Sequence, residues 1–135
     1  MTQIGNKNTI LVVDDEEALG DMLTLMLTRL GHSAVACSSP VAALHLLADK
    51  PERFDVVMVD EIMPEMRGTQ LTRQLLRIKD DLPVILLTGH GSLIPLEEVH
   101  AAGLRAVLTK PVLKEHLRAA LEMVNVPRRR AFLLH

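Results

Sequence analysis

Five polar residues stand where short apolar runs of the sequence end: Asp14, Asp15, Asp60, Thr88 and Lys110. Three of them are carboxylates, which repel one another when they are crowded, and a hard divalent cation such as Mg²⁺ relieves that repulsion. A hydroxyl and an ammonium group bind phosphoryl oxygens. Brought together, residues of these types would therefore form a Mg²⁺-dependent site for a phosphoryl group.

The apolar runs alternate with helical patterns along the chain. The runs are short and apolar and predict buried strands over residues 9–13, 33–37, 54–59, 83–87 and 105–108. Apolar residues at helical spacing predict helices over residues 16–30, 40–48, 69–79, 95–103 and 112–124. This alternation predicts an α/β fold, in which helices cover both faces of a parallel sheet and the crossovers are right-handed. Ligands of such sheets bind at the carboxyl ends of the strands, so the five polar residues are expected at one edge.

Length and composition limit the class of protein. The chain has 135 residues, of which 48% are apolar and 24% charged, and this suits one globular domain over residues 9–124. Residues 1–8 are expected to form an N-terminal extension. Residues 125–135, which include three consecutive arginines, are expected to form a tail or linker.

Charge, hydropathy and cysteine content indicate a cytoplasmic domain. The formal net charge of −2 provides no basic field, so we expect no direct contact with nucleic acid. No apolar run reaches the roughly 18 residues that span a bilayer, and residues 1–8 lack the apolar core of a signal peptide. We therefore expect no membrane contact by this domain, although attachment to a membrane-bound protein stays open. The single cysteine, Cys37, fits a reducing compartment.

Each of the five polar residues also has an ordinary structural interpretation. The aspartate pair could cap the first helix, because Glu17 stands at capping-box spacing. Asp60 could form an Asx-turn, Thr88 could simply end a strand, and Lys110 could be a surface lysine. The sequence contains no Gly-x-Gly-x-x-Gly motif, P-loop or Cys/His ligand set that would favour another chemistry, and His90 is interpreted as a loop residue.

Four stretches of the sequence carry a resemblance to a known family. They are Ile-Leu-Val-Val-Asp-Asp-Glu at 10–16, Asp-Glu-Ile-Met-Pro-Glu-Met-Arg-Gly at 60–68, Val-Ile-Leu-Leu-Thr-Gly at 84–89, and Ala-Gly at 102–103 ahead of Leu-Thr-Lys-Pro at 108–111. Because the four occur in this order at the predicted strand ends, the chain resembles, over residues 8–124, the receiver domain of two-component response regulators.

The resemblance implies a fold and a role for each site residue. The fold is a flavodoxin-like, doubly wound (βα)5 arrangement, with a five-stranded parallel sheet in the order 2-1-3-4-5. Asp60 is the implied phosphoacceptor, and Thr88 and Lys110 are the implied contacts of the phosphoryl group. The Lys110–Pro111 peptide bond is expected to be cis. The residues that the resemblance assigns to Mg²⁺ are Asp14, Asp15, Asp60 and, through its backbone carbonyl, Ile62.

The resemblance also implies partners. Receivers take a phosphoryl group from a phosphohistidine, so a sensor histidine kinase or a histidine phosphotransfer protein is expected. A receiver is a substrate of phosphotransfer that promotes its own phosphorylation and dephosphorylation, so whether this domain should be classed as an enzyme is left open. The loop Thr-Gly-His-Gly at 88–91 is similar to that of receivers in hybrid sensor kinases. A homodimer through the face formed by residues 95–103, 105–108 and 112–124 is a further expectation.

One position departs from the family pattern and keeps alternatives open. Val107 stands where the family usually has Tyr or Phe as a rotamer switch. A receiver-like interaction module that works without phosphate is therefore a second hypothesis. A third is a small phosphohydrolase with an aspartyl nucleophile, but such enzymes commonly have an acid two residues after the nucleophile, where this chain has Ile62.

Overall fold

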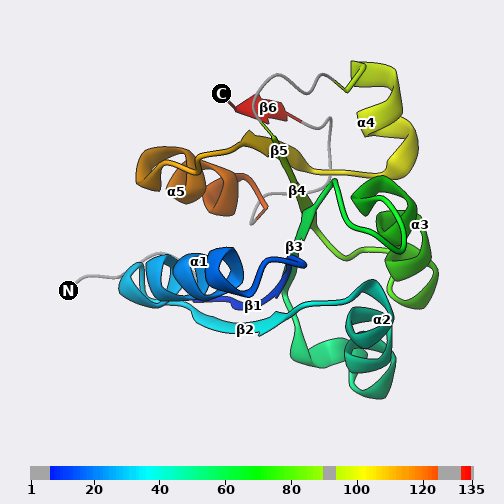
Figure 1. Cartoon of the computed structure of the whole chain (residues 1–135), viewed down its shortest axis with the longest axis horizontal. Coiled ribbons are helices and arrows are strands. Elements are labelled where there is room, and N and C mark those ends of the chain that lie inside the picture. The colour runs from blue at the N-terminus through cyan, green and yellow to red at the C-terminus, as the bar shows by residue number, and fades with distance from the viewer. Residues whose placement is uncertain (1–6, 90–93, 125–131, 135) are drawn as a thin grey trace.

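The computed structural model describes residues 7–89, 94–124 and 132–134, in which strands and helices alternate as predicted (Figure 1). The strands are β1 (Thr9–Val13), β2 (Ser33–Cys37), β3 (Val56–Asp60), β4 (Val84–Thr88), β5 (Ala106–Thr109) and β6 (Phe132–Leu134). The helices are α1 (Glu17–Arg29), α2 (Pro40–Asp49), the short 3₁₀ helix η1 (Pro51–Arg53), α3 (Gly68–Ile78), α4 (Leu96–Ala102) and α5 (Lys114–Met123). Within this described part, no helix is both long and apolar enough to cross a membrane.

All the strands pair in parallel in one sheet, whose order is β2-β1-β3-β4-β5-β6. The first five follow the order 2-1-3-4-5, so the predicted flavodoxin-like fold is confirmed. The sequence did not predict β6, whose backbone pairs with the outer edge of β5. The sequence also did not predict η1, which stands between α2 and β3.

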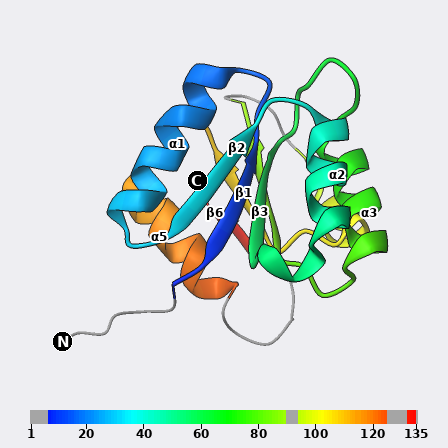
Figure 2. The ribbon, with the colours of Figure 1, turned by 90° about the horizontal axis from the view of Figure 1, so that it is seen from below.

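The helices form two layers, one on each face of the sheet. Figure 2 shows α1 and α5 on one side and α2 and α3 on the other. Successive side chains of a strand point to opposite faces, and accordingly Val59 packs in the apolar cluster under α2, α3 and α4, whereas Met58 packs in the cluster under α1 and α5. Every residue of β3 and β4 is buried, which is typical of central strands covered on both faces.

Local signals set several element boundaries. The Ser39 hydroxyl accepts a hydrogen bond from the Ala42 N–H at 3.0 Å and so caps α2, with Pro40 in the first turn. Gly31 and Gly103 follow helices with φ of +98° and +86°, a conformation that favours glycine. The structure shifts β3, β4 and β5 one or two residues toward the C-terminus of the predicted ranges, because pairing with neighbouring strands and not hydropathy determines where a strand begins.

Candidate functional site

Strand register brings the predicted site residues to one edge of the sheet. Val13 pairs with Val59, so Asp14, which follows β1, and Asp60, which ends β3, lie at the carboxyl ends of two adjacent strands. Asp60 in turn pairs with Leu87 at the end of β4. One residue further along, Thr88 pairs with Thr109, immediately before Lys110. The strands thus place all five polar residues at their carboxyl ends, as the sequence predicts.

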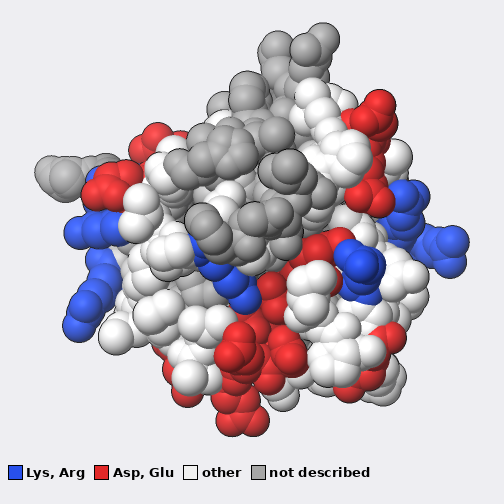
Figure 3. Space-filling view, turned by 45° about the horizontal axis from the view of Figure 1, so that its top comes forward, with Lys and Arg blue, Asp and Glu red and all other residues white. Residues whose placement is uncertain are grey.

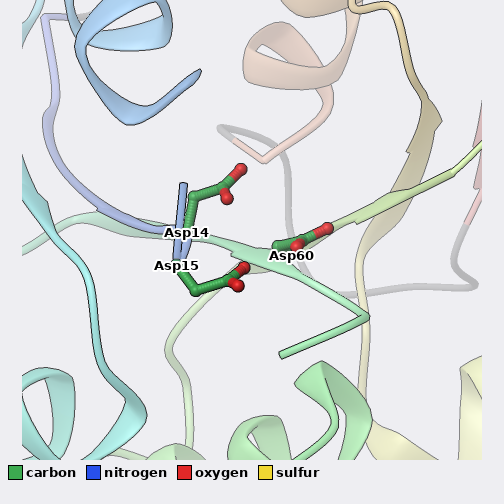
Figure 4. A group of neighbouring side chains, drawn as sticks. All are labelled: Asp14, Asp15 and Asp60. Carbon is green, nitrogen blue, oxygen red and sulfur yellow. The ribbon is translucent and has the colours of Figure 1, made fainter. Parts of the chain in front are cut away.

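The three aspartates form a compact carboxylate cluster. Asp14, Asp15 and Asp60 each offer a ligand oxygen, and these oxygens lie within 4.8 Å of one another. Figure 4 shows the three side chains extending from neighbouring segments toward a common space. Asp14 is 1% exposed and Asp60 5% exposed, whereas Asp15 is open to solvent. An all-oxygen set of this kind, with one side open to water, fits Mg²⁺, which keeps several of its waters when it binds to carboxylates.

Lys110 is the counter-ion of the two buried aspartates. Its Nζ lies 2.9 Å from Asp60 Oδ1 and 3.3 Å from Asp14 Oδ2. The backbone N–H of Lys110 donates to the carbonyl of Thr88 at 2.8 Å, which fixes the start of the chain segment after β5. The peptide bond between Lys110 and Pro111 is cis, as the resemblance implies. Lys110 is therefore a cation held over the carboxylate cluster and is not the surface lysine of the ordinary interpretation.

The pKa values reflect this crowding. Burial raises the pKa of Asp60; the hydrogen bond and charge of Lys110 lower it, and the charges of Asp14 and Asp15 raise it, leaving it above its ordinary value of 3.8. Burial lowers the pKa of Lys110, but its bonds to the two buried aspartates outweigh burial and raise the pKa above 10.5. Lys110 therefore keeps its positive charge near neutral pH, and that charge only partly offsets the effects of burial, Asp14 and Asp15 on Asp60.

The capping interpretation of Asp14 does not describe the structure. Helix α1 has Glu16 as its N-cap, without a side-chain cap, and Asp14 Oδ1 accepts the Glu16 N–H at 2.9 Å. Asp14 thus shapes the turn into α1 with one oxygen and contacts Lys110 with the other. Of the remaining predicted site residues, Thr88 is buried at the end of β4, and the side chain of Ile62 is exposed. His90 lies outside the described residues.

Glu61 is a buried carboxylate at this edge that the sequence analysis did not single out. It follows Asp60 and is 4% exposed. Its Oε1 accepts the Thr69 N–H at 2.9 Å, and its Oε2 lies 3.4 Å from Arg67 Nη1. One signal in the sequence could have identified Glu61. Arg67 precedes the first residue of α3, and its side chain has no atom that can accept a hydrogen bond from the first N–H groups of that helix. An acceptor for those N–H groups therefore had to come from elsewhere in the chain.

Acidic side chains line part of a hollow beside the carboxylate cluster. A cavity of about 220 Å³ lies between α1 and the end of β2, and its lining includes Asp14, Glu17, Asp21 and Cys37. Figure 3 shows a group of Asp and Glu side chains in the middle and lower part of the face that it displays, with further acidic side chains toward its sides.

Comparison with known proteins places this geometry in context. The family described as response regulator receiver domain matches residues 10–122. The transcriptional regulatory protein GlrR of Escherichia coli is 37% identical over 113 residues, which are 84% of this chain and 25% of that protein. The response regulator MprA of Mycobacterium sp. (strain KMS) is 37% identical over 112 residues, or 83% of this chain and 48% of that protein. The chain thus spans at most about half the length of these relatives.

A solved structure shows the same fold. The crystal structure of a response regulator receiver domain protein from Clostridium thermocellum superposes with a TM-score of 0.80 at 30% sequence identity, covering 86% of this chain and 92% of that chain. The likeness therefore covers almost the whole of the neighbouring domain.

Proposed function

Because the chain belongs to the family of response regulator receiver domains, we propose that it is the phosphoacceptor of a two-component phosphorelay, with Asp60 as the residue that is phosphorylated in the presence of Mg²⁺. One observation supports this assignment above the others. A single ammonium group, Lys110 Nζ, lies within 3.3 Å of two buried carboxylates that also form a possible metal cluster with Asp15.

The residues that would hold Mg²⁺ are Asp14, Asp15, Asp60 and the backbone carbonyl of Ile62. When bound, the cation would supply positive charge against the oxygens of the transferring phosphoryl group. The donor set is suited to this cation because it consists of oxygen atoms with net negative charge, which hard divalent cations prefer.

Asp60 acts as the nucleophile in the proposed transfer. One of its carboxylate oxygens forms a bond to phosphorus while the P–N bond of a phosphohistidine breaks, and the electron pair of that bond stays on the ring nitrogen. The donor histidine leaves as neutral imidazole when its other ring nitrogen carries a proton. Asp60 becomes an acyl phosphate, and water later cleaves it to the carboxylate and inorganic phosphate.

Lys110 and Thr88 have complementary roles in this proposal. The ammonium group of Lys110 already contacts Asp60 Oδ1. After the transfer it would pair with a negatively charged phosphoryl oxygen. Thr88 ends the adjacent strand β4, where its hydroxyl would donate to the phosphoryl group. Most of the catalysis is then positioning and charge compensation by groups that the sheet holds in place.

The partner that fits this chemistry is a protein with a phosphorylated histidine, either a sensor histidine kinase or a histidine phosphotransfer protein. Attachment to a hybrid kinase, a cytoplasmic location and a homodimer through α4, β5 and α5 stay predictions. The named relatives are a transcriptional regulatory protein and a response regulator, each longer than the part that this chain matches.

Val107 keeps a second function open, that of a receiver-like interaction module independent of phosphate. Its side chain is buried in the apolar cluster under α2, α3 and α4, so β5 has no aromatic ring there that could turn toward Thr88. The intact set of carboxylates, Lys110 and Thr88 favours the phosphoacceptor over this alternative.

Intact-mass spectrometry with a small phosphodonor, such as acetyl phosphate, tests the proposal. Wild type with Mg²⁺ should gain one phosphoryl group, whereas Asp60→Asn, or wild type with a chelator, should gain none. Lys110→Ala and Thr88→Ala should keep the fold, measured by circular dichroism, but should be phosphorylated at least about tenfold more slowly. An unmodified wild type, under conditions that label a control receiver, would refute the phosphoacceptor function.

A further inference from the structure

Glu61 directs a buried carboxylate away from the aspartate cluster and toward α3. Oε1 accepts the Thr69 N–H at 2.9 Å, and Oε2 accepts the Thr69 hydroxyl at 3.3 Å. Arg67 Nη1 lies 3.4 Å from the same Oε2. These partners stand at the first turn of α3, although Glu61 is the direct neighbour of Asp60 in the chain.

The backbone of Glu61 is held as firmly as its side chain. Its N–H donates to the Leu87 carbonyl at 2.9 Å, and its carbonyl accepts the Gly68 N–H at 2.9 Å. Gly68 also packs closely against Asp60, since a Cβ placed on Gly68 would lie 2.5 Å from the Asp60 carbonyl oxygen. Residues 62–67 therefore form a loop that closes where Gly68 meets the backbone carbonyls of Asp60 and Glu61.

The charges near Glu61 explain why a carboxylate is needed where the two ends of the 62–67 loop meet. A buried carboxylate is costly unless it is paired and hydrogen-bonded, and Glu61 has both a cation and two donors. The positive end of the α3 dipole favours an anion there, but it disfavours the guanidinium of Arg67 unless a negative group compensates. Glu61 thus satisfies the helix terminus and its neighbouring arginine with one side chain.

We propose that Glu61 is a positioning residue of the metal site, which holds Asp60 and the start of the 62–67 loop in the orientation that binds Mg²⁺. This inference rests on the proposed function, because it concerns how the same site binds its cation. Residues that orient metal ligands without touching the metal commonly contribute ten- to a hundredfold to affinity. A helix cap without this role would lower the stability of the protein and leave its Mg²⁺ affinity unchanged.

Isothermal titration calorimetry with MgCl₂ tests the inference, at a temperature where circular dichroism shows every variant to be folded. Glu61→Ala should raise the Mg²⁺ dissociation constant about tenfold or more. Glu61→Gln keeps an acceptor for the Thr69 N–H but loses the charge that pairs with Arg67, so it should raise the constant about threefold. Glu65→Gln is the matched control, because Glu65 lies exposed in the same loop and the substitution removes the same charge; its constant should stay within about twofold.

Phosphorylation kinetics give a second measurement. If Glu61 acts by positioning, the slower labelling of Glu61→Ala by acetyl phosphate should recover at saturating Mg²⁺, whereas a loss that persists at saturation would contradict a role in metal binding. Should the alanine variant fail to fold, the glutamine variant decides. A dissociation constant within twofold of wild type in each folded Glu61 variant overturns the inference and leaves the proposed function intact. A wild type that binds no Mg²⁺ overturns both.

Discussion

Replacing Asp60 with Asn should stabilise the metal-free protein and abolish its stabilisation by Mg²⁺. Lys110 Nζ lies 2.9 Å from Asp60 Oδ1, an attraction of about 6 kcal/mol at an effective dielectric constant of about 20. On the same scale, a charged carboxylate oxygen of Asp14 or Asp15 within 4.8 Å of an Asp60 oxygen repels it by about 3.5 kcal/mol or more. Asp14 and Asp15 each exert such a repulsion, although solvent screens the exposed Asp15. Attraction and repulsion therefore nearly cancel, and the lost hydration of the buried carboxylate is left uncompensated.

The expected size of the effect follows from this balance. An Asn side chain has the same shape and keeps an oxygen that can accept from Lys110, but it has no charge to desolvate. We expect the metal-free free energy of unfolding to rise by about 1 kcal/mol, which is about 3–5 °C in melting temperature for a domain of this size. For wild type, Mg²⁺ at a hundredfold excess over its dissociation constant should add about 2.7 kcal/mol, or roughly 10 °C. The Asn variant should lack this rise.

Thermal unfolding followed by circular dichroism or calorimetry, in EDTA and in MgCl₂, measures both quantities. Fluorescence is unsuitable because the chain has no Trp or Tyr. Asp49→Asn makes the same change at an exposed position at the end of α2, and it should keep the full Mg²⁺-dependent rise. An Asp60→Asn variant that is less stable without metal and still stabilised by Mg²⁺ would refute the reasoning, because the cation would then bind elsewhere.

Two further predictions concern packing and pH. Gly68→Ala should lower the free energy of unfolding by about 2–3 kcal/mol, because its Cβ would lie 2.5 Å from the Asp60 carbonyl oxygen. Gly20→Ala in α1 should be neutral or stabilising by up to about 1 kcal/mol, because its Cβ would meet only the Ala36 Cβ, at an ordinary 3.6 Å. Urea unfolding measures both variants, and a Gly68→Ala variant as stable as Gly20→Ala would contradict the role of close packing at Gly68. The Nδ1 atom of His32 accepts the Asn8 N–H at 3.0 Å, and burial lowers the pKa of this histidine below its ordinary value of 6.5. The contribution of His32 to the free energy of unfolding should therefore be complete above pH 6.5. It should fall as the pH decreases from 6.5 through the lower pKa of the folded state. Comparing the stability of wild type and His32→Gln between pH 7 and pH 5 checks this, and parallel curves would contradict it.

The sequence predicts the fold well where the signal is local. Strands β1 and β2 have the predicted bounds, and helix ends at Gly31 and Gly103 follow from glycine's access to positive φ. Strand order is a different matter, because adjacency depends on contacts between distant segments; it came from the family resemblance and not from periodicity. For the same reason β6 was missed. A three-residue strand has almost no pattern of its own, and its backbone pairs with the side of β5 that faces away from β4.

The candidate site was predictable as a set of residue types at strand ends but not as a set of contacts. The sequence places Lys110 near the carboxylates, whereas the structure shows that it contacts Asp14 as well as Asp60. The sequence pattern does not distinguish Glu61, because its partner Thr69 is eight residues away and its carboxylate does not share the cluster. Alternation of side chains along an extended segment sends neighbouring acids to different environments, so acids that are adjacent in the sequence need not share a site.

If Asp60 is phosphorylated as we propose, Val107 and Lys110 bear on how that change would reach the rest of the domain. A valine in a packed cluster has essentially one side-chain rotamer, so Val107 cannot report a change at Asp60 as a turning ring would. Lys110 differs, because its ammonium group contacts both buried carboxylates, and a phosphoryl group on Asp60 would compete for those contacts. Lys110 directly follows β5, whose backbone pairs with β4 on one side and β6 on the other. A shift of this lysine would therefore act on β5 and on the strands paired with it. If the chain is the phosphoacceptor that we propose, Lys110 and the backbone of β5 provide a route for this coupling, whereas a phosphate-independent module needs neither to move.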